Sequence, residues 1–211
     1  MGLLIFDLDG TLFQTSTATV PAVQEGFLSM GLPPPPSEDI CSFIGSPVHQ
    51  YYAWIRSKCP KDAASALLAE IDRLEMEFAS SRGRLFPGVL RALQNLRDSV
   101  SQLSLCSNGP KQWVEHVIRT QGLEGLFDAV KYRVSSHETK GKMVYELLQK
   151  LSARPAVVIG DRGSDIEAAR ENGILSIAAA YGYGSLQELD LADARAMSPG
   201  ELPSLIDKLL R

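Results

Sequence analysis

Cysteine is scarce in this chain, and no two cysteines stand close together in the sequence. Cys41, Cys59 and Cys106 lie far apart and lack the CxxC spacing of zinc sites and redox-active pairs. An odd and scattered set of thiols is also unlike the disulfide framework of a small secreted domain. We therefore expect a reduced, cytoplasmic protein whose chemistry does not depend on sulfur.

Long hydrophobic runs and an excess of basic residues are missing as well. The longest apolar runs, such as residues 3–6 and 156–159, are far too short to cross a bilayer, which takes about 20 residues. The 25 acidic residues outnumber the 21 basic ones and give a net charge of −4, whereas a nucleic-acid-binding surface is basic. We expect no membrane and no nucleic-acid partner, and a monomer or homodimer that acts on a small molecule.

Short apolar runs alternate with amphipathic stretches along most of the chain. The runs predict strands at Leu3–Phe6, Leu103–Cys106, Phe127–Val130, Ala156–Ile159 and Leu175–Ala179. Apolar residues at helical spacing predict helices around 89–96, 114–118 and 144–151, and Ser198-Pro199-Gly200-Glu201 has the form of a capping box that opens a last helix. This alternation is typical of a doubly wound α/β fold, in which helices cover both faces of a parallel sheet.

One segment interrupts the alternation. Residues 15–84 contain three apolar helical faces, at positions 20–28, 48–55 and 67–78, but no strand pattern. A segment of this length is too long for a simple connection between a strand and a helix. We therefore predict an α/β core domain, residues 1–14 plus 85–211, and an α-helical domain, residues 15–84, inserted after the first strand.

Two pairs of aspartates follow predicted strands. Asp7 and Asp9 come directly after the first strand, and Asp161 and Asp165 follow the strand that ends at Ile159. Ligands of an open parallel sheet bind beyond the carboxyl ends of its strands, so both pairs should meet at one edge. Two like charges ~4 Å apart repel by about 4 kcal/mol at an effective dielectric constant of 20, and a cation must offset this repulsion. Oxygen ligands without histidine or cysteine favour Mg²⁺, which binds one or two carboxylates together with a substrate phosphate.

Each of these residues alone also has an ordinary structural explanation. A single aspartate in such a place is typical of a turn or a helix N-cap, but two pairs at the ends of two strands favour a site. Ser107 and Asn108 follow another predicted strand, and Lys140 opens a predicted helix. A hydroxyl, backbone N–H groups and an ammonium are suited to holding phosphate. Lys142 is a second candidate for the ammonium, and Lys140 is preferred because it lies nearer the end of the strand.

Together these motifs resemble the haloacid dehalogenase (HAD) superfamily of phosphohydrolases. Asp7-Leu8-Asp9-Gly10-Thr11-Leu12 is similar to the first motif, DxDGT, and Gly160-Asp161-Arg162-Gly163-Ser164-Asp165 to the fourth, GDxxxD. Ser107-Asn108 and Lys140 match the second and third. The resemblance covers almost the whole chain, and the helical insertion resembles the α-helical cap of the phosphoglycolate phosphatase-like branch. That branch often has Asp-Ser shortly after DGTL, where this chain lacks the aspartate.

The resemblance implies a Mg²⁺-dependent phosphatase that works through an aspartyl-phosphate. Asp7 would be the nucleophile, and Asp9 would be the general acid and base. The metal ligands would be Asp7, Asp161, Asp165 and the backbone carbonyl of Asp9, and the phosphoryl oxygens would be held by Ser107, Asn108 and Lys140. Gly45, Ser46 and Arg162 are candidate contacts to the substrate or the cap. Further candidates on the cap are Tyr51, Tyr52, Trp54, Arg56 and Lys58, although aromatic residues at helical spacing usually pack in a core.

Other activities remain open at this point. A dehalogenase needs no acid two residues after its nucleophile, because halide leaves without a proton, so Asp9 favours phosphate. A sugar phosphomutase keeps both aspartates, and the sequence hardly separates it from a phosphatase. A phospho-accepting signalling module is a smaller domain without a helical insertion, and a binding protein without turnover would not need all of the catalytic positions. We predict hydrolysis of a small phosphorylated metabolite, such as a phosphoglycolate-like compound, a nucleotide or a sugar phosphate.

Overall fold

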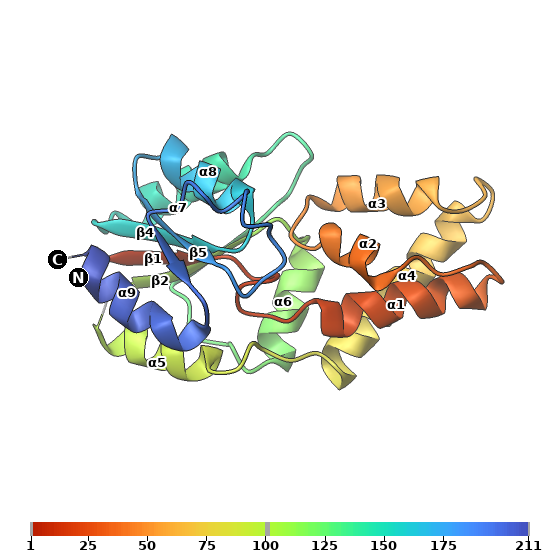
Figure 1. The fold of residues 1–211 in the computed structure, drawn as a ribbon, viewed down its shortest axis with the longest axis horizontal. Helices are drawn as coiled ribbons and strands as arrows, with labels where there is room; N and C mark the ends of the chain where they lie inside the picture. The colour runs from red at the N-terminus through yellow and green to blue at the C-terminus, as the bar shows by residue number, and fades with distance from the viewer. Residues whose placement is uncertain (1, 100–101, 211) are drawn as a thin grey trace.

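The computed structural model describes residues 2–99 and 102–210, and these residues form a six-stranded parallel sheet surrounded by helices (Figure 1). The strands are β1 (Leu3–Phe6), β2 (Gln102–Ser107), β3 (Ala129–Tyr132), β4 (Ala156–Gly160), β5 (Leu175–Ala179) and β6 (Ala194–Ala196). Their order across the sheet is β3-β2-β1-β4-β5-β6, and all neighbouring pairs are parallel. The predicted doubly wound α/β fold is confirmed.

β1 and β4 lie side by side at the centre of the sheet. Leu3 pairs with Ala156 and Phe6 with Ile159, so the two strands end at the same level. The chain runs outward from β1 through β2 and β3, and then returns to β4 on the other side of β1. At such a reversal of strand order, the connections leave a crevice at the carboxyl ends of the strands, which is where ligands bind in this kind of sheet.

Helices cover both faces of the sheet. One layer consists of α5 (Val89–Ser99), α6 (Lys111–Thr120) and α9 (Leu202–Leu209), and the other of α7 (Lys140–Leu151) and α8 (Gly163–Glu171). Leu4 and Phe6 of β1 pack into the first layer, whereas Leu3 and Ile5 pack into the second, because successive side chains of a strand point to opposite faces. Figure 1 shows α5 and α9 below the sheet and α7 and α8 above it. Burial of both faces explains why β1 is a continuous apolar run.

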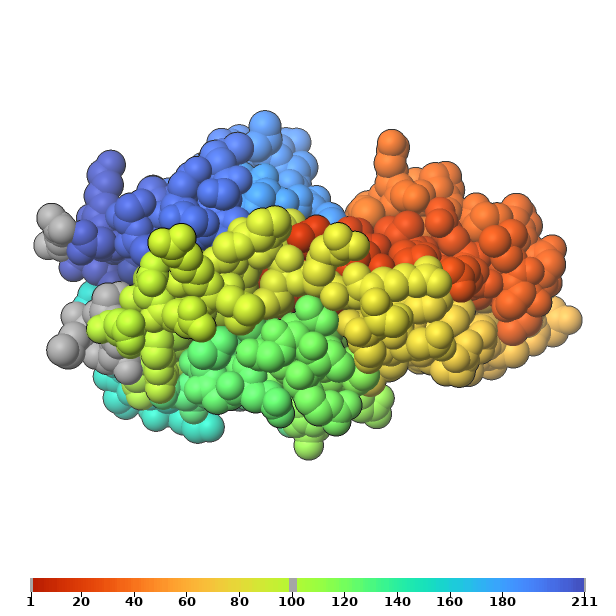
Figure 2. All heavy atoms as spheres, turned by 90° about the horizontal axis from the view of Figure 1, so that it is seen from below, coloured from red at the N-terminus to blue at the C-terminus, as the bar shows by residue number. Residues whose placement is uncertain are grey.

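Residues 15–84, all of which the structure describes, form four helices and no strand; we call this segment the helical insert. Its helices are α1 (Ser16–Ser29), α2 (Ser37–Ser42), α3 (Val48–Ser57) and α4 (Ala64–Ser81). They enclose a hydrophobic core of their own, to which Phe27, Tyr51 and Ile71 belong. The insert joins the main core where α4 packs against α6, as Figure 2 shows from below. None of the helices in residues 2–99 and 102–210 is long and apolar enough to cross a membrane.

Four details differ from the sequence-based prediction. The short helix α2 of the helical insert was not predicted. β3 begins at Ala129, two residues later than predicted, because Phe127 packs into the main core from a loop instead of pairing in the sheet. The short edge strand β6 was not predicted. The prediction of a capping box at Ser198 was wrong, because the Ser198 side chain makes no capping hydrogen bond. The Glu201 carboxylate instead accepts a hydrogen bond from the Met197 N–H, and a 3₁₀ turn precedes α9.

Candidate active site

Asp7 lies at the end of β1, where its carboxylate pairs with Lys140. Lys140 Nζ donates a hydrogen bond of 2.6 Å to Asp7 Oδ1 and forms a second ion pair with Asp165. The side chains of Lys140 and Asp7 are only 4% and 3% exposed. Lys140 is the first residue of α7, whose N-cap Thr139 accepts a hydrogen bond from the backbone N–H of Lys142. The side chain of Lys142 itself is exposed, so the buried ammonium at this edge is that of Lys140.

Three buried carboxylates meet at this point. Asp7, Asp161 and Asp165 each place one oxygen within 4.8 Å of the others. Burial raises the pKa of Asp7 well above its ordinary value, although the charge of Lys140 partly opposes this, and burial together with the charge of Asp165 raises the pKa of Asp161 to about 7. Burial alone would lower the pKa of Lys140, but the charges of Asp165 and Asp7 raise it above its ordinary value. The lysine is therefore fully charged, and the carboxylates still lack a sufficient positive charge.

This carboxylate cluster fits a divalent cation. Asp7 Oδ2 is buried and has no hydrogen-bond partner among the described residues. Three carboxylates and one ammonium leave two negative charges, which an ion such as Mg²⁺ would offset. The donors are all carboxylate oxygens, as Mg²⁺ prefers. The carboxylate of Asp9 does not belong to the cluster, so only the backbone carbonyl of Asp9 is left for the predicted role as a ligand.

Loops at the strand ends hold the two later aspartates in place. Asp165 lies in the first turn of α8 and accepts a hydrogen bond of 3.0 Å from the Arg162 N–H at the helix N-terminus. Asp161 accepts hydrogen bonds from the Tyr183 N–H at 2.8 Å and from Thr11 Oγ1 at 3.3 Å. The close approach of the first and fourth motifs requires glycine at position 10, because a Cβ atom there would lie 2.2 Å from Asp161 Oδ2.

The carboxylate of Asp9 has different surroundings from that of Asp7. Thr15 Oγ1 and Trp113 Nε1 donate hydrogen bonds to Asp9 Oδ1, at 2.8 and 2.9 Å. Ser107 Oγ lies 3.4 Å from Asp9 Oδ2 as a third donor. Burial raises the pKa of Asp9, although the hydrogen bonds from Trp113 and Thr15 partly oppose this. One carboxylate is thus paired with an ammonium and the other with neutral donors, as two different chemical roles would require.

Ser107 and Asn108 follow β2 beside Asp9. Ser107 Oγ accepts a hydrogen bond of 2.9 Å from the Gly109 N–H, which orients the hydroxyl. Asn108 Oδ1 accepts a hydrogen bond of 2.6 Å from the Arg133 guanidinium. Both residues are buried at the end of their strand, close to the N-terminus of α6 at Lys111.

Core side chains also bind the loop of the helical insert that contains Gly45 and Ser46. Asn108 Nδ2 donates a hydrogen bond of 2.9 Å to the carbonyl oxygen of Gly45. The Arg162 guanidinium donates hydrogen bonds of 3.1 Å to the carbonyl oxygens of Ser42 and Ile44. Arg162 therefore contacts the insert and holds this loop over the carboxyl ends of the strands.

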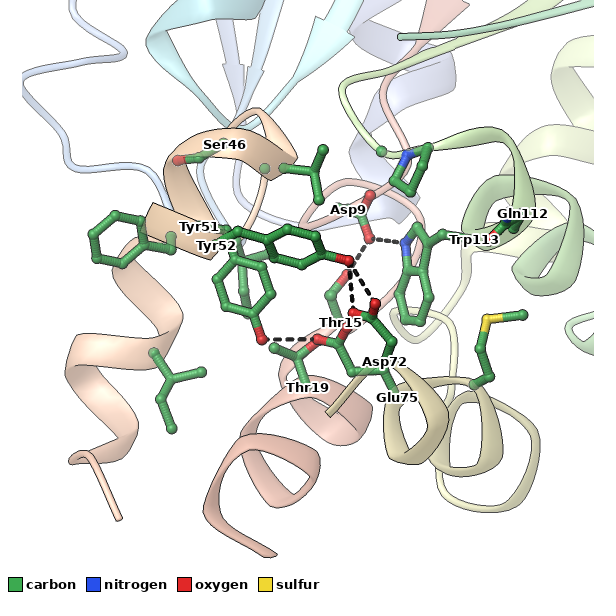
Figure 3. Close-up of a pocket in the computed structure, with 18 residues that line it drawn as sticks. Asp9, Thr15, Thr19, Ser46, Tyr51, Tyr52, Asp72, Glu75, Gln112 and Trp113 are labelled. Carbon is green, nitrogen blue, oxygen red and sulfur yellow. Dashed lines mark hydrogen bonds between the residues drawn. The ribbon is translucent and has the colours of Figure 1, made fainter. Parts of the chain in front are cut away.

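Two cavities open on either side of this loop, and Gly45 and Ser46 line both. The first, which we call the Asp9 cavity, measures about 140 Å³ and lies between the helical insert and α6 (Figure 3). The second, the Lys140 cavity, measures about 510 Å³, and its lining includes Asn108, Arg133, Lys140 and Arg162. Of the predicted residues on the insert, Tyr51 and Tyr52 line the Asp9 cavity. Trp54 instead stacks on Phe43, and Arg56 and Lys58 are exposed.

Sequence reasoning missed the residues that support the aspartates. Thr11 lies inside the DxDGT motif, so its position was a signal that could have been used. Trp113 and Arg133 show no comparable signal, because each meets its partner only through tertiary packing, whereas Thr15 is only six residues from Asp9 in the sequence.

Comparisons with known proteins agree with this geometry. Residues 4–179 match the family model of the haloacid dehalogenase-like hydrolases. The phosphoglycolate phosphatase of Synechococcus elongatus is 27% identical, and the alignment covers 100% of both chains. A haloacid dehalogenase-like family hydrolase from Streptococcus pneumoniae superposes with a TM-score of 0.84, at 25% identity and over 98% of each chain. A Thermotoga maritima protein assigned as a β-phosphoglucomutase superposes with a TM-score of 0.82 over 100% of each chain; at 22% identity, this shows a shared fold alone.

Proposed function

We propose a specific reaction for this chain, which belongs to the haloacid dehalogenase-like hydrolase family and is similar to phosphoglycolate phosphatases over its whole length, and is therefore a phosphatase-type hydrolase. In this proposal it is a Mg²⁺-dependent enzyme that hydrolyses a small phosphorylated metabolite through an aspartyl-phosphate. The proposal rests on the contrast between Asp7 and Asp9. Asp7 lies among carboxylates beside an ammonium, whereas Asp9 is held by hydroxyl and indole donors at the mouth of a cavity. Such different surroundings suit a nucleophile and a proton-transfer group.

In the first step, a carboxylate oxygen of Asp7 attacks the phosphorus of the monoester. The bond between phosphorus and the ester oxygen breaks, and the leaving alkoxide takes a proton from Asp9. The raised pKa of Asp9 favours the protonated form that this step needs. The hydrogen bonds from Thr15 and Trp113 fix the direction in which the acid points.

In the second step, water attacks the phosphorus of the aspartyl-phosphate. The water gives its proton to Asp9, the bond between phosphorus and the Asp7 oxygen breaks, and inorganic phosphate leaves. Asp7 is then a free carboxylate and Asp9 is protonated again, so both side chains have returned to their starting states. Ser107, the backbone N–H of Asn108 and Lys140 hold the phosphoryl oxygens during both steps, in a reaction that depends mostly on positioning and charge.

The metal and the helical insert have supporting roles in this proposal. Asp7, Asp161, Asp165 and the backbone carbonyl of Asp9 would hold Mg²⁺, which when bound offsets negative charge on the phosphoryl group. Residues 15–84 act as a cap on the core of residues 1–14 and 85–211. Gly45, Ser46 and Arg162 belong to the contact between cap and core, which closes the site above the strand ends.

The variant Asp7→Asn tests the mechanism with p-nitrophenyl phosphate, a generic aryl monoester, in the presence of Mg²⁺. Asparagine keeps the size of the side chain but is a poor nucleophile, so we expect the rate to fall by roughly a thousandfold or more. Circular dichroism of the variant shows whether it is folded. A folded Asp7→Asn variant that hydrolyses the ester at the wild-type rate would refute the mechanism.

A sugar phosphomutase is the second candidate, because it shares every step up to the aspartyl-phosphate and because a structure assigned to that activity has the same fold. The product separates the two. A phosphatase converts a hexose 1-phosphate to free sugar and inorganic phosphate, whereas a mutase yields the 6-phosphate. A module that accepts phosphate without turnover would instead remain phosphorylated, with the release of at most one equivalent of free sugar and no inorganic phosphate. A panel of phosphoglycolate, nucleotides and sugar phosphates extends the same assay to the substrate.

A further inference from the structure

The Asp9 cavity is the space into which the leaving group of the substrate extends, if the proposed function holds. Asp9 must reach the ester oxygen in order to protonate it, so the atoms beyond that oxygen lie next to the Asp9 carboxylate. The Asp9 cavity opens at that carboxylate and is enclosed by α3 and α4 of the helical insert and by α6 of the core (Figure 3). The chemistry of its lining therefore selects the leaving group.

The lining of this cavity is acidic and contains no basic side chain. Its charged members, all in described parts of the chain, are Asp9, Asp72 and Glu75, and none of its lining residues is lysine, arginine or histidine. Asp72 and Glu75 are three residues apart on α4 and so lie on the same face of the helix. The guanidinium carbon of Arg56 lies 5.8 Å from the centre of the Tyr52 ring, but Arg56 is not a lining residue.

Tyrosine hydroxyls hold the two carboxylates of α4 at the cavity wall. The Tyr52 hydroxyl lies 2.7 Å from both oxygens of Asp72, and the Tyr51 hydroxyl donates a hydrogen bond of 3.1 Å to Glu75 Oε1. Burial raises the pKa of Asp72, and burial together with the charge of Asp72 raises the pKa of Glu75 to about 7. Negative charge is thus already unfavourable in this cavity. A further carboxylate would be repelled, and a cation would be stabilised.

The aromatic side chains of the cavity also favour a cation. The rings of Tyr51, Tyr52 and Trp113 line the cavity, and the face of an aromatic ring attracts an ammonium group.

We infer that the substrate is the phosphate monoester of an amino alcohol, and that Asp72 and Glu75 bind the ammonium of its leaving group. The inference rests on the proposed function and narrows the class of substrate from small phosphorylated metabolites in general to those with an ammonium on the leaving group. It separates this chain from the phosphoglycolate phosphatases that it resembles, because phosphoglycolate carries a carboxylate on its leaving group. Asp72 and Glu75 are accordingly the specificity-determining residues.

Three monoesters of matched size test the inference directly. The 2-aminoethyl, 2-hydroxyethyl and carboxymethyl phosphates differ mainly in the charge at the end of the leaving group. We expect kcat/KM to fall by about tenfold or more from the aminoethyl to the hydroxyethyl ester, and again from the hydroxyethyl to the carboxymethyl ester. Equal values for the first two esters, or a carboxymethyl ester that equals or exceeds the aminoethyl ester, would overturn the inference.

Variants of α4 tie the preference to the cavity. Glu75→Gln and Asp72→Asn each remove one charge and keep the shape, so each should lower kcat/KM for the aminoethyl ester by about tenfold, mainly through KM, and raise it for the carboxymethyl ester. Glu77→Gln is the matched control, because Glu77 lies on the same helix but is exposed and pairs with Arg73. If Glu77→Gln changes the ester preference as much as Glu75→Gln does, the cavity is not responsible.

The generic aryl ester distinguishes failure of this inference from failure of the proposed function. If wild-type protein with Mg²⁺ hydrolyses neither p-nitrophenyl phosphate nor any of the three small esters, the proposed function itself fails. If it hydrolyses any of these esters but prefers the carboxymethyl over the aminoethyl phosphate, only the assignment of the leaving group fails. Melting temperatures of the α4 variants show whether a change in preference comes from loss of folding.

Discussion

Lys140 Nζ lies 2.6 Å from Asp7 Oδ1, and this buried ion pair links the start of α7 to the end of β1. The two residues are 133 positions apart in the sequence. The same ammonium also pairs with Asp165, so one lysine compensates two members of the carboxylate cluster. In the proposed reaction Lys140 holds the phosphoryl group as well, which makes it necessary both for the folded state and for activity.

Lys140→Met should therefore damage stability and catalysis together. Removing one partner of a buried ion pair leaves an uncompensated charge and costs about 3–5 kcal/mol of unfolding free energy. We expect that loss in urea unfolding at neutral pH without Mg²⁺, and a loss of roughly a hundredfold or more in kcat with p-nitrophenyl phosphate. Lys142→Met is the control, because the side chain of Lys142 is exposed on the same turn. Equal effects of the two substitutions would show that the buried pair has no special role.

Asp9→Asn should separate the two proposed steps. An aryl leaving group departs without a proton, so the first step should still occur with p-nitrophenyl phosphate. The second step needs a base, and its loss should slow turnover by about 10²- to 10⁴-fold. Rapid-mixing measurements should then show a burst of about one equivalent of p-nitrophenol followed by slow release. An alkyl ester, whose leaving group needs the acid, should give no burst. Loss of the burst with the aryl ester, or a burst with both esters, would contradict the role of Asp9.

Asp161→Asn should weaken the binding of Mg²⁺. A ligand that binds only the folded protein raises its stability by about 2.7 kcal/mol at a concentration of 100 times Kd, so Mg²⁺ should raise the Tm of the wild-type protein. The variant lacks one of the clustered carboxylates and should need at least about tenfold more Mg²⁺ for the same rise. Asp190→Asn, which changes an exposed aspartate paired with Arg195, serves as the control. A rise in Tm that is the same in Asp161→Asn as in the wild type would place the metal elsewhere.

Gly10→Ala should disturb the contact between the first and fourth motifs. Gly10 has a φ of +86°, and a Cβ atom there would lie 2.2 Å from Asp161 Oδ2. Gly31→Ala is the matched control, since Gly31 has a φ of +70° but no described atom within 4 Å of the position of a Cβ. The unfavourable φ alone should cost about 1–2 kcal/mol at either position. We expect Gly10→Ala to lose at least about 1 kcal/mol more than Gly31→Ala in urea unfolding and to bind Mg²⁺ more weakly. Equal losses of unfolding free energy in the two variants would mean that the loop at Gly10 accommodates the Cβ atom without further loss of stability.

The central part of this architecture could be predicted because it depends on local pattern. β1 and β4 are buried on both faces, so each is a continuous apolar run, and the aspartates that follow them must meet where the two strands end. The edge strand β6 could not be found in this way, because three residues of sequence Ala-Arg-Ala contain no periodic signal. Its pairing depends on β5, which lies beside it only in the folded protein.

The surroundings of the aspartates could be predicted less well than their positions. Trp113 reaches Asp9 across 104 positions of sequence, and the contact depends on how α6 packs against α4 of the helical insert. Glu75 and Asp72 are ordinary polar residues on an amphipathic helix, and only the tertiary structure places them at the wall of a cavity. The sequence left open whether Arg162 contacts the substrate or the cap; in the structure its guanidinium binds carbonyl groups of the insert.

Glu75 should also make the stability of the protein depend on pH. Burial raises its pKa from 4.5 to about 7, so the folded protein binds this proton more tightly than the unfolded chain does. The stability that the proton contributes is fully present below about pH 4.5 and is lost as the pH rises through about 7. Glu75→Gln cannot lose a proton there. Between pH 5 and pH 8, the unfolding free energy of the wild type should therefore fall by about 1–3 kcal/mol relative to that of Glu75→Gln, since one pKa unit corresponds to about 1.4 kcal/mol. Other carboxylates are common to both proteins and cancel in the difference. Urea unfolding of the two proteins across this range provides the measurement, and a constant difference between them would show that Glu75 is charged at all of these pH values.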